Sequence, residues 1–139
     1  MDVNYADTLI AVADDCPVTA SAVPVARGGT KTIAVVQYEM LAAAPYTLTS
    51  EDVLFQTWLR RQDPVPPAAE HARLRDAFFA RPQACLRASP LPKRHGFGLR
   101  CDGAARVALC PMESGEYARL VAGAAGGTVV LKAMRSRRG

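Results

Sequence analysis

Apolar side chains recur along the chain with two different periods, and the change between them predicts the order of the elements. Between residues 32 and 80 the apolar positions are three or four residues apart, the spacing of helices with one buried face. Before and after this stretch they alternate with polar residues or run on without a break, as they do in strands. The pattern predicts a strand, three helices, a strand, a hairpin, a short helix and a last strand.

The first two predicted helices are marked by their start and stop residues. The first covers about residues 32–43 and ends before Pro45. The second begins at an N-cap supplied by Thr49-Ser50 and runs to about Arg61. Leu54 and Trp58 lie four residues apart on its apolar stripe, so we expect both to be buried in the core.

The remaining elements are expected to be shorter. A third helix is predicted from about residue 67 to residue 80, and a fourth from Ser114 to Gly123. Residues 7–13 and 84–89 are predicted to be strands, and residues 90–92 an extended, proline-stiffened segment. Residues 128–134 are apolar on both faces, which favours a central position in the sheet.

Asp102-Gly103 separates two alternating segments, 97–101 and 105–110, and predicts a β-hairpin. An odd-length loop such as 102–104 keeps the apolar residues on one face and places Arg100 opposite Arg106. Facing arginines repel each other, so this register favours an anion or an acidic partner over them. It also places Cys101 and Cys110 on opposite faces, which predicts that no disulfide joins them.

These elements predict an α+β fold, with a mainly antiparallel sheet of about five strands and about four helices packed on one face of it. The 139 residues are 50% hydrophobic and 22% charged, as expected for a single globular domain, residues 1–139, with a basic tail at 135–139. The polar N-terminus and the lack of any apolar run near the ~20 residues of a membrane span predict a cytoplasmic protein without membrane contact. The four cysteines are widely spaced, so we expect free thiols, no metal site and no cofactor.

Charge is distributed unevenly along the chain. Residues 1–89 carry 8 basic and 10 acidic side chains, a net charge of −2, whereas residues 90–139 carry 9 and 3, a net charge of +6. A basic segment of this kind is typical of a surface for phosphates or nucleic acid, although a solvated basic loop has the same composition. The candidate anion-binding residues are Arg87, Lys93, Arg94, His95, Arg100 and Arg106.

Six strings of residues together resemble a bacterial family known as domain of unknown function 6157. They are Asp15-Cys16-Pro17-Val18-Thr19, Tyr38-Glu39-Met40, residues 50–55, residues 85–94, Met112-Glu113-Ser114 with Tyr117, and residues 131–136. The resemblance spans nearly the whole chain. It implies a compact single-domain bacterial protein, and it implies no activity, cofactor or catalytic residue.

The sequence favours a binding module with a basic anion-binding surface over two alternatives. Its partner would be a phosphorylated small molecule, an acidic protein face or, with weaker support, nucleic acid. The first alternative is a small enzyme that uses Cys85 as a reactive thiol, or the loop Lys93-Arg94-His95. The second is a structural homodimer in which arginines pair with acids of the N-terminal segment.

Overall fold

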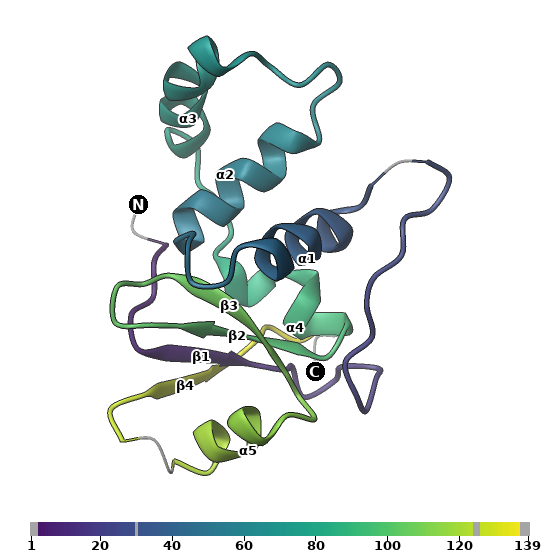
Figure 1. Cartoon of the computed structure of the whole chain (residues 1–139), viewed down its shortest axis with the longest axis vertical. Helices are drawn as coiled ribbons and strands as arrows, with labels where there is room; N and C mark the ends of the chain where they lie inside the picture. Colours follow the sequence, from purple (N-terminus) through teal and green to yellow (C-terminus); the bar gives the residue numbers. More distant parts are fainter. Residues whose placement is uncertain (1–2, 30, 124–125, 137–139) are drawn as a thin grey trace.

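A four-stranded sheet with the strand order β3-β2-β1-β4 forms the centre of the computed structural model, which describes residues 3–29, 31–123 and 126–136 (Figure 1). The strands are β1 (Thr8–Ala11), β2 (Phe97–Cys101), β3 (Val107–Pro111) and β4 (Val129–Lys132). β1 pairs antiparallel with β2, β2 pairs antiparallel with β3, and β4 pairs parallel with β1. The mixed α+β class is therefore confirmed, but the described residues form four strands and not five, and one pairing is parallel.

The apolar C-terminal strand lies at an edge of the sheet, so its predicted central position is wrong. Val129 is 54% exposed and Val130 37% exposed, whereas all four residues of β1 are buried. Apolar residues on both faces indicated a buried strand, but among the described residues β4 pairs with β1 alone and most of its residues stay exposed. The short β1, with its N-terminal place in the chain, occupies the centre instead.

Three helices cover one face of the sheet: α1 (Ile33–Ala43), α2 (Ser50–Arg60) and α4 (Pro90–Arg94) (Figure 1). Thr49 caps α2, which confirms the predicted N-cap, and it forms a capping box with Asp52. Thr32 caps α1, which was not predicted. The buried core below these helices includes Ile10, Val36, Met40, Leu41, Val53, Leu86, Leu91, Leu99 and Val107.

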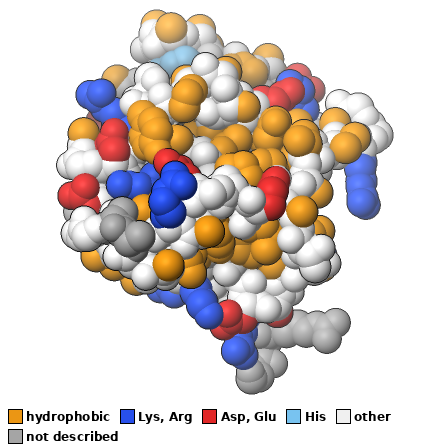
Figure 2. Space-filling model, turned by 60° about the horizontal axis from the view of Figure 1, so that its bottom comes forward, with side chains coloured by type: hydrophobic (Ala, Val, Ile, Leu, Met, Phe, Trp, Pro, Cys, Tyr) orange, Lys and Arg blue, Asp and Glu red, His pale blue; other side chains and the backbone are white. Residues whose placement is uncertain are grey.

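A further helix, α5 (Gly115–Val121), lies on the opposite face, so the expectation that all helices share one face is wrong. Leu120 of α5 packs there on Leu9 and Ala11 of β1, and the backbone amide of Val12 donates a hydrogen bond to the Tyr117 hydroxyl at 2.9 Å. Figure 2 shows this side of the molecule, where apolar side chains lie among interspersed acidic and basic ones.

The segment before β2 is helical, which corrects the strand predicted at 84–89 and the extended segment at 90–92. Leu86–Ala88 form a short 3-10 helix and Pro90–Arg94 form α4. The Ser89 hydroxyl accepts a hydrogen bond from the Leu91 amide, and Pro90 occupies the first helical position, where its missing N–H is no loss. A proline that stiffens an extended chain equally suits the first turn of a helix.

The hairpin has the odd-length loop that was predicted, but the loop is shifted by one residue. Asp102 accepts the amide of Ala105, its carboxylate accepts the amides of Ala104 and Arg106, and Ala105 adopts a left-handed conformation with φ 63°. Leu99 consequently pairs with Leu109, and Arg100 pairs with Ala108 and not with Arg106. The predicted opposition of two arginines is therefore wrong, and so is the argument that it calls for an anion.

The helix α3 (His71–Phe79), which follows a 3-10 turn at Ala68–Glu70, has no fully buried residue and projects together with the end of α2 (Figure 1). No helix in the described ranges has both the length and the apolar character needed to span a membrane.

Candidate functional site

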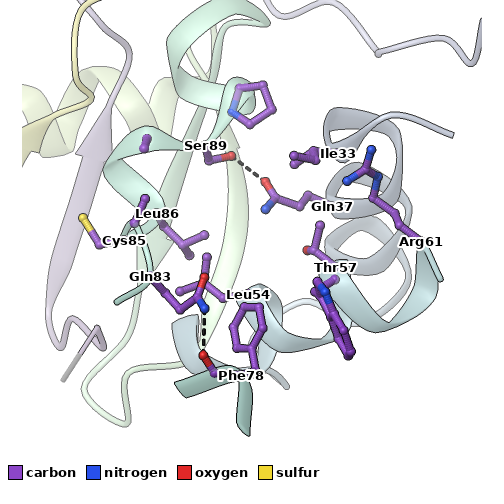
Figure 3. Close-up of a pocket in the computed structure, with 14 residues that line it drawn as sticks. Ile33, Gln37, Leu54, Thr57, Arg61, Phe78, Gln83, Cys85, Leu86 and Ser89 are labelled. Atoms are coloured by element: carbon purple, nitrogen blue, oxygen red, sulfur yellow. Dashed lines mark hydrogen bonds between the residues drawn. The ribbon is translucent and has the colours of Figure 1, made fainter. Parts of the chain in front are cut away.

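A cavity of about 260 Å³ opens between α1, α2 and the segment that leads into α4 (Figure 3). Its apolar walls are formed by Ile33, Leu54, Trp58, Phe78 and Leu86. Gln37, Thr57, Gln83, Cys85 and Ser89 add polar groups, and Arg61 lies at its edge. An apolar hollow with a few convergent polar groups is the usual form of a small-molecule site.

Gln37 is fixed in this cavity by the cap of α4. Its side chain is 3% exposed, and the Ser89 hydroxyl donates a hydrogen bond of 2.6 Å to its Oε1 atom. Because Ser89 accepts the Leu91 amide at the same time, its hydroxyl proton is available for the glutamine oxygen. Figure 3 shows the amide oxygen turned to Ser89 and the nitrogen facing the space between Leu54 and Thr57.

Trp58 lies in the cavity wall and is partly exposed, so its predicted burial in the core is wrong. α2 buries Val53, Phe55, Thr57 and Leu59, while Leu54 and Trp58 face the cavity along a separate stripe. Trp58 and Phe78 are in aromatic contact, with ring centroids 5.8 Å apart. The helical period identified this apolar stripe correctly. It could not distinguish a stripe that packs against other side chains from one that lines a cavity.

A wider groove adjoins the cavity and carries a concentration of basic side chains. Arg27, Lys31, Arg61, Arg94 and His95 line it, and the lining contains no acidic residue among those that the structure describes. The two hollows share Ile33, Arg61 and Pro90. The basic groove, as we call it, thus lies directly beside the cavity.

The outer wall of the basic groove is the loop before α1, which is tied down at several points. The Ala22 amide donates to the carbonyl of His95 at 2.9 Å, and the Glu113 carboxylate accepts the amide and the hydroxyl of Ser21 at 2.8 and 2.7 Å. These two hydrogen bonds lower the pKa of Glu113 below its ordinary value. Gly96, at φ 74°, lets the loop approach so closely that an added Cβ would lie 3.0 Å from the Ala20 carbonyl oxygen.

Most cations of the groove are not neutralised by acids. Lys31 forms an ion pair with Glu39 at 2.8 Å, whereas Arg27, Arg61 and Arg94 form no ion pair within the described ranges. Burial lowers the pKa of His95, and the charge of Arg94 lowers it further. The groove therefore presents positive charge chiefly through its arginines.

The structure separates the six residues that the sequence proposed for anion binding. Arg94 and His95 line the groove, while Lys93, which is next to them in the chain, does not. Arg87 donates through Nε to the Lys132 carbonyl at 2.8 Å and so fastens the end of β4. Arg100 donates to the Cys101 carbonyl. Arg100 and Arg106 belong to the hairpin and do not line the groove. Because β2 rises by about 3.3 Å per residue, Arg100 lies about 10 Å along the strand from its first residue, Phe97.

Cys85 lies in the cavity wall, where the Tyr5 hydroxyl donates a hydrogen bond to its Sγ atom at 3.1 Å. Burial, with this hydrogen bond, raises the pKa of Tyr5 to about 12. A neutral tyrosine of this kind donates a proton to a hydrogen bond and does not act as a base toward the thiol. His95 lines the basic groove and does not line the cavity.

Gln37, Arg27, Lys31 and Arg61 are site residues that the sequence did not identify. Arg61 lies at the C-terminal end of α2, where a positive charge is favourable without any ligand. The sequence could have indicated Gln37, because this polar residue lies between the apolar residues 33–36 and 40–41 of α1. The structure shows that it is buried. The described residues contain no group of three histidine, cysteine, aspartate or glutamate side chains that could hold a metal ion.

Comparison with known proteins gives one match. A family described as a family of unknown function, DUF6157, matches residues 1–139. No curated protein and no solved structure matches the chain.

Proposed function

The chain belongs to this family of unknown function over its full length, and we propose from its site that it is a binding module for an anionic small molecule. The anion is held in the basic groove by Arg27, Arg61 and Arg94, with Lys31 and His95 beside them. The single observation that supports this proposal is the gathering of these side chains in a hollow whose described lining has no acid.

Physical chemistry favours an anion in such a place. Arginine presents a planar set of N–H donors that can bind a carboxylate or a phosphate in bidentate fashion. The loop wall contains Pro17 and Pro24 and is fastened through Ser21 and Ala22, so little conformational entropy remains to be lost when a ligand binds. The proposal keeps the anion-binding surface inferred from the sequence and moves it from the hairpin to the groove.

The first prediction uses two pairs of neighbouring cations. Arg61→Ala and Arg94→Ala should each weaken the binding of sulfate by about tenfold, because each removes a charge-assisted hydrogen bond. Arg60→Ala and Lys93→Ala remove the same charge next to those positions, but outside the groove lining, and should change the affinity by less than about twofold. Affinity is measured by calorimetry, with sodium chloride used to match the ionic strength.

The control pairs decide the outcome. Equal losses in all four variants would mean that sulfate responds to net charge alone, and the proposal would then be wrong. Sulfate binding that no variant weakens would place the anion elsewhere and would equally contradict the proposal.

A further inference from the structure

We infer that the ligand is an amphipathic anion with an aromatic ring that carries a hydrogen-bond acceptor: the ring occupies the cavity and the anionic group lies in the basic groove. This inference rests on the proposed function of the groove and specifies the class of molecule that it binds. Three observations on the cavity support it, and each concerns a different part of the ligand.

The two neighbouring hollows suit a ligand with two unlike ends. Ile33, Arg61 and Pro90 line both of them, so the apolar space and the arginines lie next to each other. In Figure 3 the guanidinium of Arg61 lies beside Ile33 at the edge of the cavity. A molecule whose ring fills the cavity can thus place a charged substituent directly at Arg61.

The size and the walls of the cavity suit one substituted ring. Its volume is about 260 Å³, compared with about 150 Å³ for an engineered apolar cavity that binds benzene. Trp58 and Phe78 form part of the wall, and Leu54 and Leu86 add aliphatic surface. A planar ring can pack against the two aromatic side chains in offset or edge-to-face geometry.

The side-chain amide of Gln37 is the reason for placing a hydrogen-bond acceptor on the ligand ring. Its oxygen accepts the Ser89 hydroxyl, whereas its Nε2 atom has no hydrogen-bond partner among the described residues; the residue as a whole is 3% exposed, but Nε2 is not one of the fully buried unpartnered atoms and can be reached from the cavity. An amide nitrogen that faces a cavity without a protein partner is available to donate to an acceptor on a ligand. A carbonyl oxygen on the ligand ring would complete this amide and fix the orientation of the ring.

The second prediction tests the three parts of the ligand separately with four probes. 4-Acetylphenyl phosphate carries ring, acceptor and anion, and 4-isopropylphenyl phosphate has nearly the same shape without the acceptor. Acetophenone lacks the anion, and inorganic phosphate lacks the ring. The probes are titrated into isotopically labelled protein, and the signals followed are the Gln37 side-chain amide and the indole of Trp58, which is the one tryptophan of the chain.

We expect 4-acetylphenyl phosphate to bind at least about tenfold more tightly than inorganic phosphate and about fivefold more tightly than the isopropyl probe. The Gln37 and Trp58 signals should shift with the acetyl probe and stay in place with inorganic phosphate. Gln37→Leu should abolish the preference for acetyl over isopropyl, and Ala88→Phe, which fills the cavity, should abolish the advantage of both aryl probes. Neither variant should alter the affinity for inorganic phosphate, which also shows that each variant is folded.

Failure of the inference is distinguishable from failure of the proposed function. If inorganic phosphate binds in the groove but the aryl probes bind no more tightly and leave the Trp58 signal in place, the inference is overturned while the anion-binding function stands. If acetophenone and 4-acetylphenyl phosphate bind in the cavity equally well, the two hollows are not one site, and the inference is again overturned. If no probe binds, both proposals fall.

Discussion

The two buried cysteines of the sheet, Cys101 and Cys110, lie on its opposite faces. Cys101 packs in the core below α1 and α2, and Cys110 packs on the other face with Leu120. Both are free thiols, which confirms the prediction that no disulfide joins them. Burial raises the pKa of Cys101 to about 11 and that of Cys110 to about 12, because a thiolate is poorly solvated at either place.

The third prediction concerns alkaline stability and follows from these shifts. Unfolded thiols ionise near pH 9, whereas the folded ones keep their protons up to about pH 11 and 12. The native state therefore binds more protons above pH 9, and the free energy of unfolding should fall as the pH rises through this window. Each thiol contributes up to about 1.4 kcal/mol per pH unit.

Urea unfolding of the wild type and of Cys101→Ala with Cys110→Ala measures this slope between pH 8 and 10. The double variant should show a clearly shallower decline, whatever its stability at pH 8. A slope that is identical in both proteins would show that the two thiols do not govern the alkaline loss.

Among the elements, those with a sequence signal for both period and ends were predictable. α1 and α2 each combine an apolar stripe with a capping residue, and both were found within about one residue of their expected bounds. The segment 84–89 alternates like a strand, yet its two buried residues, Leu86 and Ser89, lie three positions apart. Over so few residues two buried positions do not establish a period, so the cap at Ser89 decided the structure.

The docking of α5 on the sheet depends on a residue without a side chain. Gly98 of β2 lies beneath Tyr117, and a Cβ added there would lie 2.9 Å from the Tyr117 Cε2 atom and 3.1 Å from the Cys110 carbonyl oxygen. No pattern in the sequence around Gly98 indicates this role, because only the sheet brings β2 next to α5. Contacts of this kind follow from topology.

The fourth prediction is that Gly98→Ala destabilises the protein by about 1–3 kcal/mol, because the methyl group overpacks the space between β2 and α5. Gly126→Ala serves as the control, since an added Cβ meets no atom within 4 Å there, and it should change stability by less than about 0.5 kcal/mol. Chemical denaturation gives both values. Equal stabilities of the two variants would mean that α5 tolerates displacement from the sheet.

At the scale of the whole molecule, the candidate site was largely unpredictable, because its parts come from segments that are distant in the sequence. Arg27 and Arg94 lie in different halves of the chain and meet across the basic groove. The sequence placed the basic character in the C-terminal third, where net charge is indeed concentrated. The cations of the basic groove instead come from both halves of the chain. A charge count along the sequence does not reveal that the fold brings them together.

β1 joins the two apolar clusters of the molecule and lies between β2 and β4. Ile10 faces the cluster below α1 and α2, whereas Leu9 and Ala11 face the cluster below α5. The C-terminal strand β4 pairs with β1 across more than 100 residues, for example Thr8 with Val129. Neither cluster can remain intact when β1 leaves the sheet, so we expect the whole chain to unfold as one unit.

The fifth prediction tests this coupling with two truncations on opposite faces of β1. Ile10 and Leu9 are both 0% exposed, and Ile10→Ala and Leu9→Ala should each cost about 2–5 kcal/mol. In each variant Trp58 fluorescence, which reports on α2, and far-UV circular dichroism, which reports on all elements, should follow one coincident transition. Val129→Ala, at the exposed edge strand, should cost less than about 1 kcal/mol. If Leu9→Ala shifted the circular dichroism transition and left the Trp58 transition in place, the two clusters would unfold independently, and the molecule would consist of two units on the two faces of one sheet.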